Sequence, residues 1–274
     1  LVSLYDFDNR AGHFADVDSR MKFCLLTLAG RAETEPTADF AFFLHDPSII
    51  DNFSFTLSPG EIALLNPNTG TCPVFRTRRD AALVLSIYRN MPVLFREHAP
   101  DGDPWGFNTR PGLFHMGNDS KLLVPNLAPQ GADLLPLYEA KYVHIFNHRW
   151  GADRDELLNG YDPATQANFR YGVSRVEVLR RLGVTTQDWL TGFRDITNAT
   201  NERTLIPSVI PVAGVGHNLT LFDTSNAPSW WLATVMTSFV VDFCARVKLG
   251  GTHMSSFIIR QLPIPSPGTF RQAP

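Results

Sequence analysis

A long apolar segment near the carboxyl end constrains the fold more than any other feature of this chain. Trp230–Leu249 lies between Pro228 and Gly250-Gly251, which are residue types found at the start and the end of helices. Its length would also suit a membrane span, but it holds three charged residues, Asp242, Arg246 and Lys248. We therefore predict one long, mostly buried helix that ends in a left-handed glycine cap, and no membrane span.

The composition indicates a folded chain with short elements. Hydrophobic residues make up 44% of the 274 residues and charged residues 19%, which is enough for a core and excludes a disordered chain. The 20 prolines and 19 glycines predict many turns. The net charge is −3, with 11 Lys and Arg against 15 Asp and Glu in residues 1–130, and 13 against 12 in residues 131–274. Any contact with DNA phosphates must therefore come from local clusters of basic residues.

Cysteine usage and the first residues suggest the cellular setting. The three cysteines, Cys24, Cys72 and Cys244, are far apart and form no Cys-x-x-Cys motif. We therefore expect neither a disulfide framework nor a zinc ribbon, and we predict a reducing, cytoplasmic location. The chain begins Leu-Val-Ser, without Met or a signal peptide, and we interpret it as a fragment of a longer protein.

Three apolar runs predict strands in the first part of the chain. Met21–Leu28 is rich enough in apolar residues to be a buried strand, and Asp39–Leu44 is a second run that could pair with it as a hairpin. Phe53–Leu57 alternates between apolar and polar residues, as a half-buried strand does.

Helices and a connector are predicted to follow these strands. Ser58 and Glu61 have the spacing of a capping box at the start of a helix over Pro59–Leu65. Thr77–Asn90 carries apolar residues at helical spacing. The prolines and glycines between Pro100 and Gly131 then predict a connector between domains.

The remainder predicts short elements of both kinds, so the fold class is α+β. The expected elements are a strand at Lys141–Phe146, a polar loop at Trp150–Asn168, a helix at Ser174–Leu182 with Glu177 in capping-box spacing, an irregular or edge strand at Thr204–Val212, and a strand at Phe257–Ile259. Pro207 and Pro211 restrict the strand at Thr204–Val212 to a sheet edge, because proline cannot donate a ladder hydrogen bond.

Motifs for catalysis are missing from the sequence. It holds no Gly-x-Ser-x-Gly, no phosphate-binding loop, no Gly-x-Gly-x-x-Gly and no His-Glu-x-x-His. Asn66-Pro67-Asn68-Thr69 differs from the Asn-Pro-Pro-Tyr tetrad of adenine methyltransferases, because Thr69 has no ring to stack on a flipped base. We interpret it as a turn after a short helix.

Two histidines allow several interpretations. His144 and His148 could hold a metal if they lay on one face of a helix. The strand predicted here would spread them apart, and no third ligand is near in the sequence. Ordinary polar histidines and contact with nucleic acid therefore remain as the alternatives.

The densest polar cluster in the chain lies between Thr191 and Thr204. It comprises Arg194, Asp195, Thr197, Asn198, Thr200, Asn201, Glu202 and Arg203. Arg can bind guanine or phosphate, Asn can bind adenine through two hydrogen bonds, and Thr can bind either base. The alternative is a solvated loop in which the acidic side chains pair with the arginines.

Other basic residues stand at the ends of predicted elements. Arg76, Arg78 and Arg79 could hold phosphates at a helix start, or could simply be solvated. Lys248 and His253 flank two glycines, which either let the backbone approach a ligand or form a plain helix cap.

Several segments resemble the adenine-specific DNA methyltransferases of restriction–modification and phage-defence systems, of the type IIG and type I-like kinds. They are Phe14–Leu28, Leu65–Ala81, Tyr138-Glu139-Ala140-Lys141 with His148-Arg149-Trp150, Gly192–Thr197 with Asn201–Thr204, and Phe239–Pro265. The family usually has Gly where Ala140 stands. The end of the chain also resembles type I specificity subunits.

The resemblance implies the carboxyl-terminal part of an enzyme that methylates adenine N6 in double-stranded DNA with S-adenosylmethionine. The cofactor motif and the catalytic tetrad would lie upstream, together with any nuclease domain, so no cofactor and no methyl transfer are expected of this fragment. Residues 1–60 would end the methyltransferase sheet, residues 61–130 would form a helical connector, and residues 131–274 would form a target-recognition domain. The residues expected to contact DNA are Arg194, Thr197, Asn198, Thr200, Asn201, Arg203, Lys141, His148, Arg149, Lys248, His253, Arg76, Arg78 and Arg79.

Two other functions remain open. The chain could be a protein-interaction module that docks onto a methylase or nuclease subunit without touching DNA. It could also be an independent hydrolase that uses His144 and His148, in which case purified protein would hold stoichiometric zinc.

Overall fold

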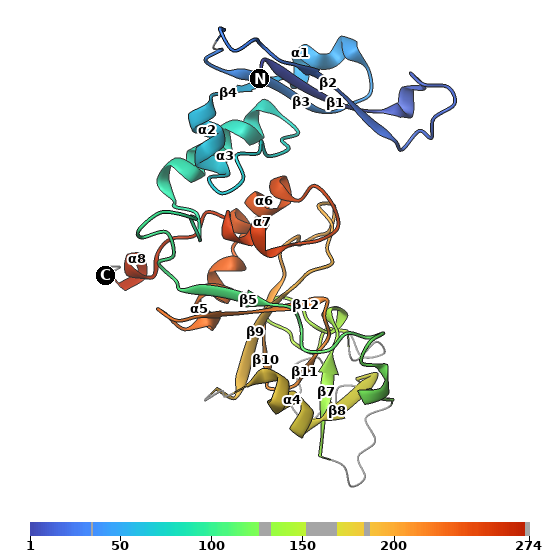
Figure 1. Cartoon of the computed structure of the whole chain (residues 1–274), viewed down its shortest axis with the longest axis vertical. Coiled ribbons are helices and arrows are strands. Elements are labelled where there is room, and N and C mark those ends of the chain that lie inside the picture. Colours follow the sequence, from blue (N-terminus) through green and yellow to red (C-terminus); the bar gives the residue numbers. More distant parts are fainter. Residues whose placement is uncertain (34, 126–132, 152–168, 184–186, 272–274) are drawn as a thin grey trace.

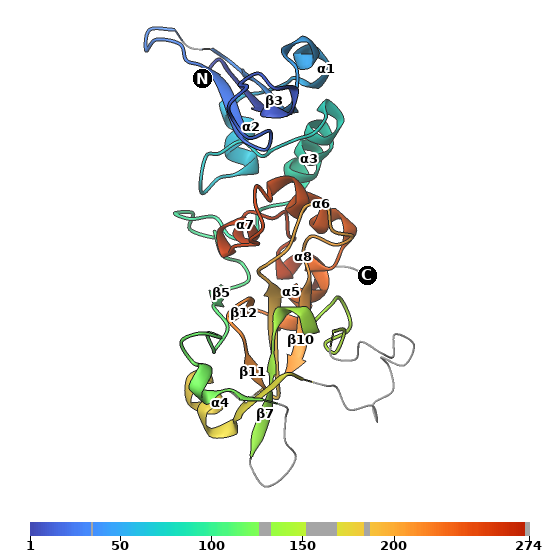
Figure 2. The same cartoon turned by 90° about the vertical axis from the view of Figure 1, so that its right-hand side faces the viewer.

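The computed structural model describes residues 1–33, 35–125, 133–151, 169–183 and 187–271, and its architecture is α+β. Figures 1 and 2 show an elongated molecule, with one sheet at the amino-terminal end, helices in the middle, and two further sheets toward the opposite end. The fold class expected from the sequence is therefore confirmed.

The amino-terminal sheet has the strand order β2-β1-β3-β4. Its strands are β1 (Ser3–Asp8), β2 (Lys22–Thr27), β3 (Ala38–Leu44) and β4 (Phe55–Leu57). β1 pairs antiparallel with β2 and parallel with β3, so the hairpin predicted between β2 and β3 is wrong. β2 is also exposed rather than buried, because it is the edge strand: Leu25 is 50% and Leu26 is 55% exposed.

Three helices follow the strands of this sheet: α1 (Ile50–Phe53), α2 (Pro59–Leu65) and α3 (Arg78–Asn90). The capping box predicted for α2 is confirmed, since the Ser58 amide donates to the Glu61 carboxylate at 2.9 Å and the Glu61 amide donates to the Ser58 hydroxyl at 3.2 Å. The Thr77 hydroxyl caps α3 by accepting from the Asp80 amide at 3.1 Å. Both helices form where the sequence predicts them.

Two further four-stranded sheets occupy the rest of the molecule. The second sheet has the order β10-β9-β12-β5 and the third has the order β11-β7-β8-β6. The strands are β5 (Phe107–Arg110), β6 (Val124–Pro125), β7 (Leu134–Tyr138), β8 (Tyr171–Ser174), β9 (Trp189–Arg194), β10 (Pro207–Pro211), β11 (Gly214–Val215) and β12 (Leu219–Thr224). β10 is an edge strand, as its prolines predict, and β5 pairs with β12 from within the predicted connector.

The strand predicted at Lys141–Phe146 is wrong. Ala140–Tyr142 form a short 3-10 helix, and a turn follows it. Tyr142 and Val143 are both buried although they are consecutive, which an alternating strand does not allow. The loop predicted at Trp150–Asn168 lies outside the described residues, apart from its first two.

The helix expected at Ser174–Leu182 is present as α4 (Arg175–Leu182), but its capping box is not formed. The Ser174 side chain makes no cap hydrogen bond. The Glu177 carboxylate instead accepts from Arg180 and Arg181, both at 2.7 Å. Two neighbouring guanidinium groups thus outcompete the backbone amide for this carboxylate.

The single long helix predicted at Trp230–Leu249 is two helices. α5 (Ser229–Met236) and α6 (Phe239–Lys248) meet at an angle of 77°. The Ser238 hydroxyl starts α6 by accepting from the Val241 amide at 3.2 Å, because serine is a strong N-cap residue. The left-handed glycine cap is also wrong, since neither Gly250 nor Gly251 has a positive φ.

No single helix among the described residues is long and apolar enough to span a membrane. α5 and α6 reach the necessary length only when they are taken together, as a bent pair.

The carboxyl-terminal segment returns to the middle of the molecule. Phe257–Ile259, predicted as a strand, lies in α7 (Ser256–Arg260), where Ile258 and Ile259 are both buried. The chain then pairs with the segment after α3, since the Leu94 amide donates to the Leu262 carbonyl at 2.9 Å, and it ends in α8 (Pro267–Arg271). One core cluster therefore combines residues of the first sheet, α3, α5, α6 and α7.

Candidate nucleic-acid interface

A tight turn at His144–Asn147 presents an aromatic side chain to solvent. The His144 amide donates to the Asn147 carbonyl at 2.7 Å, and the Asn147 amide donates back to the His144 carbonyl at 3.1 Å. Phe146, inside this turn, has a left-handed backbone with φ of 61° and is 78% exposed. We call residues 144–147 the aromatic turn.

Contacts from other elements fix the aromatic turn on the protein. The Arg194 guanidinium, at the end of β9, donates to the carbonyl of Val143 at 2.7 Å and to that of Lys141 at 3.3 Å. Behind the turn, the Tyr138 hydroxyl lies 2.8 Å from Nδ1 of His148. Arg194 was expected to contact DNA. In the structure its guanidinium instead binds the backbone next to the aromatic turn.

Two histidines of this region, His144 and His148, have a lowered pKa, which favours the neutral ring. Burial lowers the pKa of His144, and the positive charge of Arg194 lowers it further. Burial also lowers the pKa of His148, with the charge of Arg149 adding to the effect. Neutral imidazoles can both donate and accept hydrogen bonds, which suits contact with base edges or phosphates.

The polar cluster forms a loop, residues 195–204, that α6 holds in place. Asp242 of α6 is buried and accepts from the amides of Thr204 and Leu205, both at 2.8 Å. Arg246 of α6 donates to the carbonyl of Asn201 at 2.9 Å and to that of Glu202 at 3.0 Å. We call residues 195–204 the polar loop.

Only part of the polar loop faces solvent. Asn198, Thr200 and Asn201 are exposed. Thr197 is buried and donates to the Thr204 carbonyl at 2.7 Å. The Arg203 side chain is 12% exposed, and its Nε lies 3.6 Å from the Asp242 carboxylate. Thr197 and Arg203 are thus scaffold residues here, which corrects their expected role in reading bases.

The aromatic turn and the polar loop lie close together, since the charges of Glu202 and Arg203 both act on the His144 ring. A groove beside Phe146 and His148 is lined on its other side by residues of β10 and α5 and by Thr237. The Thr237 carbonyl also accepts a hydrogen bond from the Arg203 guanidinium. The aromatic turn and the polar loop, about 50 residues apart in the sequence, are therefore both next to Thr237.

The segment Gly250–His253 also joins the polar loop. The Thr197 amide donates to the Thr252 carbonyl at 3.0 Å, and the Met254 amide donates to the Asp195 carbonyl at 2.7 Å. The exposed His253 ring lies 2.9 Å from the Asp195 carboxylate. His253 therefore lies next to the polar loop, together with which it was expected to contact DNA.

Basic residues predicted in the first half lie elsewhere. The Arg78 guanidinium donates to the Asp51 carbonyl at 2.8 Å and to the Ser54 carbonyl, so it ties α3 to the end of α1. Arg76 lies over the exposed Phe43 ring at 4.4 Å, and Arg79 is exposed. These arginines belong to the amino-terminal sheet and its helices, away from the aromatic turn.

Lys248 is the clearest departure from the expected contact set. Its ammonium donates to the Leu65 carbonyl at 2.5 Å and to the Asn66 amide oxygen, and it lies 4.9 Å from the centre of the Tyr88 ring. Burial lowers its pKa to about 7. Lys248 therefore joins α6 to the end of α2 and is not presented to DNA.

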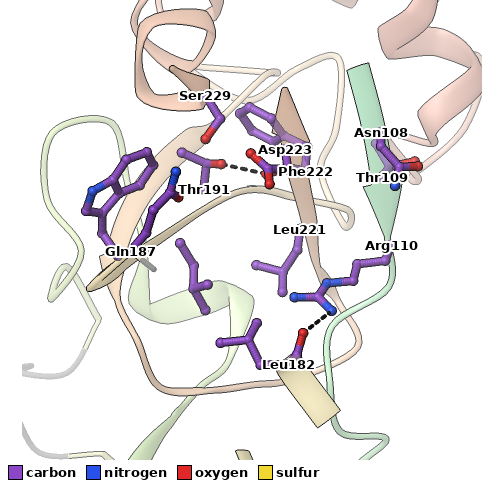
Figure 3. Close-up of a pocket in the computed structure, with 12 residues that line it drawn as sticks. Asn108, Thr109, Arg110, Leu182, Gln187, Thr191, Leu221, Phe222, Asp223 and Ser229 are labelled. Atoms are coloured by element: carbon purple, nitrogen blue, oxygen red, sulfur yellow. Dashed lines mark hydrogen bonds between the residues drawn. The ribbon is translucent and has the colours of Figure 1, made fainter. Parts of the chain in front are cut away.

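A polar hollow lies across β5, β9 and β12 (Figure 3). Asp223 and Ser229 line it, together with Arg110, whose guanidinium donates to the Leu182 carbonyl at 3.1 Å. Among the described residues that line it, there is no histidine or cysteine to form a nucleophile–base pair and no glycine-rich turn to hold a cofactor pyrophosphate or sulfonium ligand. The described lining therefore gives no support for a hydrolase centre or for an S-adenosylmethionine site.

A metal centre has no support among the residues that the structure describes. They contain no group of three or more His, Cys, Asp or Glu side chains placed to hold an ion.

No protein-family profile matches this chain, and no curated protein matches it significantly. Function is therefore inferred from the geometry of the aromatic turn and the polar loop.

Sequence reasoning missed two exposed aromatic residues of that surface. Phe146 was placed in a strand, and Trp150, which is 50% exposed and 4.7 Å from the His144 ring, was placed in a loop. The available signal was the aromatic pair on either side of Asn147-His148-Arg149, since exposed aromatic residues beside basic ones are typical of nucleic-acid binding.

Proposed function

We propose that this chain recognises double-stranded DNA for an adenine-N6 methyltransferase whose catalytic residues lie in another part of the protein or in a partner. The observation that carries the proposal is the closeness of the aromatic turn to the polar loop, whose Asp195 carboxylate also lies next to the exposed His253 ring. Lys141 and Arg149 belong to the segment that carries the aromatic turn, and the exposed Asn198, Thr200 and Asn201 belong to the polar loop. Cationic side chains position DNA, and Asn and Thr side chains can read base edges.

The charge of this surface is local, as a chain with a net charge of −3 requires. Lys141 is exposed and pairs with Glu139 at 3.0 Å, so a phosphate would compete with this carboxylate for the ammonium group. S-adenosylmethionine would be bound by the separate catalytic part, and we expect no methyl transfer from this chain alone.

Fluorescence anisotropy with a random duplex pool tests the proposal. We expect binding at low salt that weakens as salt increases, because bound cations release counterions from DNA. Lys141→Ala and Arg149→Ala should each lower the slope of log affinity against log salt by about one. Lys121→Ala, which removes an exposed lysine on the short 3-10 helix Ser120–Leu122, is the matched control and should leave the slope unchanged.

Absence of binding to any duplex at low salt would overturn this function. In that case the second candidate, docking onto a methyltransferase or nuclease subunit, becomes the better one. A specific observation favours it for the amino-terminal sheet, because Met21, Leu25, Leu26 and Leu28 are all exposed on or next to the edge strand β2. Exposed edge strands readily pair with other chains. Leu25→Lys with Leu26→Lys should then abolish binding to a purified methyltransferase subunit in a titration.

A further inference from the structure

Phe146 is the third residue of the turn His144–Asn147, where the backbone needs a positive φ and glycine or asparagine is the usual residue. A phenylalanine with a φ of 61° lies in a backbone region that is strained for side chains of this size. Its ring is 78% exposed, so little apolar burial offsets that strain. Strain that persists at an exposed position points to a contact made with something outside the molecule.

We propose that Phe146 is a stacking wedge that inserts between bases of the bound DNA. The inference rests on the proposed function and adds a residue that the sequence did not indicate. Apolar side chains inserted at a base step partly unstack it and bend the duplex, and base–aromatic stacking tolerates any sequence because every base has a π-face.

Hydrogen bonds on both sides of Phe146 hold its backbone in place. Two backbone hydrogen bonds close the aromatic turn, and the Asn147 side chain accepts from the Arg149 amide at 2.8 Å. The Arg194 guanidinium of β9 donates hydrogen bonds to the carbonyls of Lys141 and Val143, just before the turn. Little conformational entropy is therefore lost when the ring meets its partner.

The charges around the ring favour bases over an apolar protein surface. Lys141 precedes Phe146 and Arg149 follows it in the same segment, and Arg194 lies beneath that segment. Among the described carboxylates near this segment, Glu139 pairs with Lys141 at 3.0 Å and Asp195 with His253 at 2.9 Å, whereas Glu202 is exposed and its charge opposes the lowering of the His144 pKa. When the ring inserts at a base step, the cations on either side of it would lie near the phosphates on either side of that step.

The test uses the 274-residue chain and the tightest duplex selected from a random pool, with 2-aminopurine placed in turn at each step of the site. Wild-type protein should raise the 2-aminopurine fluorescence at one step, because unstacking relieves its quenching. Phe146→Ala should remove that signal and weaken binding about 5- to 150-fold, with an unchanged salt slope, because it removes stacking but no phosphate contact.

Two further variants separate stacking from folding. Phe146→Trp keeps a flat ring and should keep both the signal and the affinity. Phe146→Gly relieves the left-handed strain, so it should leave the thermal midpoint unchanged or raise it by about 2–4 °C while it still loses the signal. The control is Phe257→Ala, which removes another exposed ring, 59% accessible on α7, and should change neither reading.

The possible failures are distinguishable. If wild-type protein binds DNA and Phe146→Ala binds equally well with the same signal, the wedge is refuted and the proposed function stands. A loss of affinity together with a smaller salt slope would show that Phe146 only supports the cationic residues, which also refutes the wedge. If wild-type protein binds no DNA, both proposals fall, and the groove beside Phe146 becomes a candidate seat for a protein side chain.

Discussion

The aromatic turn and the polar loop lie close together, but they are held by different means. The polar loop is held by two charged residues of α6, since the buried Asp242 and the half-buried Arg246 contact its backbone at several points. The aromatic turn is held by its own two backbone hydrogen bonds and by one arginine from β9. The shape of the loop therefore depends on several contacts with α6, whereas that of the turn depends on its own hydrogen bonds and on a single side chain from a distant strand.

The largest effect should come from removing Asp242. Asp242→Ala leaves Arg203 and Arg246 without their carboxylate and two backbone amides without an acceptor. We expect the free energy of unfolding in urea to fall by about 3–5 kcal/mol. Asp223→Ala, an exposed carboxylate on β12, should stay within about 0.5 kcal/mol of wild type. Similar values for the two variants would contradict the view that buried charge shapes the loop.

The anchor of α6 at Lys248 should make stability depend on pH. Its pKa is about 7 in the folded chain and 10.5 when unfolded, so the unfolded chain binds more protons between these values. Stability must therefore rise with pH in this window, by about 2 kcal/mol between pH 7 and pH 9. Chemical denaturation of Lys248→Met should lack this rise, and Lys121→Met should keep it. Parallel pH profiles for wild type and Lys248→Met would mean that the ammonium is solvated.

The link between the two regions is Arg194. Arg194→Lys keeps a positive charge but loses the planar group that donates to the carbonyls of Val143 and Lys141. We expect a loss of about 1–2 kcal/mol in stability. Hydrogen exchange should become faster at the amides of His144 and Asn147 and stay unchanged in the polar loop. Faster exchange in both regions would show that they are coupled more tightly than their contacts indicate.

The smallest effect on folding should come from Asn201, whose side chain is exposed on the polar loop. Asn201→Ala should change stability by less than about 0.5 kcal/mol. If Asn201 reads an adenine, the same change should weaken binding to the preferred duplex by about 1–3 kcal/mol and relax the preference at one position. Selection from a random duplex pool measures this preference, and an identical selected sequence would exclude Asn201 from base reading.

Local signals in the sequence predicted those elements that local contacts determine. The Ser58–Glu61 capping box and the Thr77 cap act within four residues, and α2 and α3 form as expected. Ser238 is such a signal too, and recognising it as an N-cap would have divided the long helix correctly. The prolines of β10 likewise identified an edge strand.

Elements that depend on distant contacts were not predictable in this way. The insertion of β1 between β2 and β3 follows from pairing across the chain, which no periodicity encodes. Alternation at Lys141–Phe146 suggested a strand, yet Arg194 binds this segment from more than 40 residues away and a turn forms instead. The roles of Arg203 and Lys248 were missed for the same reason, since their partners Asp242 and Asn66 come from other elements.

The pairing of β5 with β12, and of Val93 with Pro263, has a consequence for exchanging specificity between proteins of this architecture. A graft that begins at residue 131 would leave the second sheet without its β5 edge strand and the carboxyl-terminal segment without its neighbour. A segment that is exchanged must instead begin before Val93 and extend beyond Ile264, so that each strand of the pair comes from the same protein.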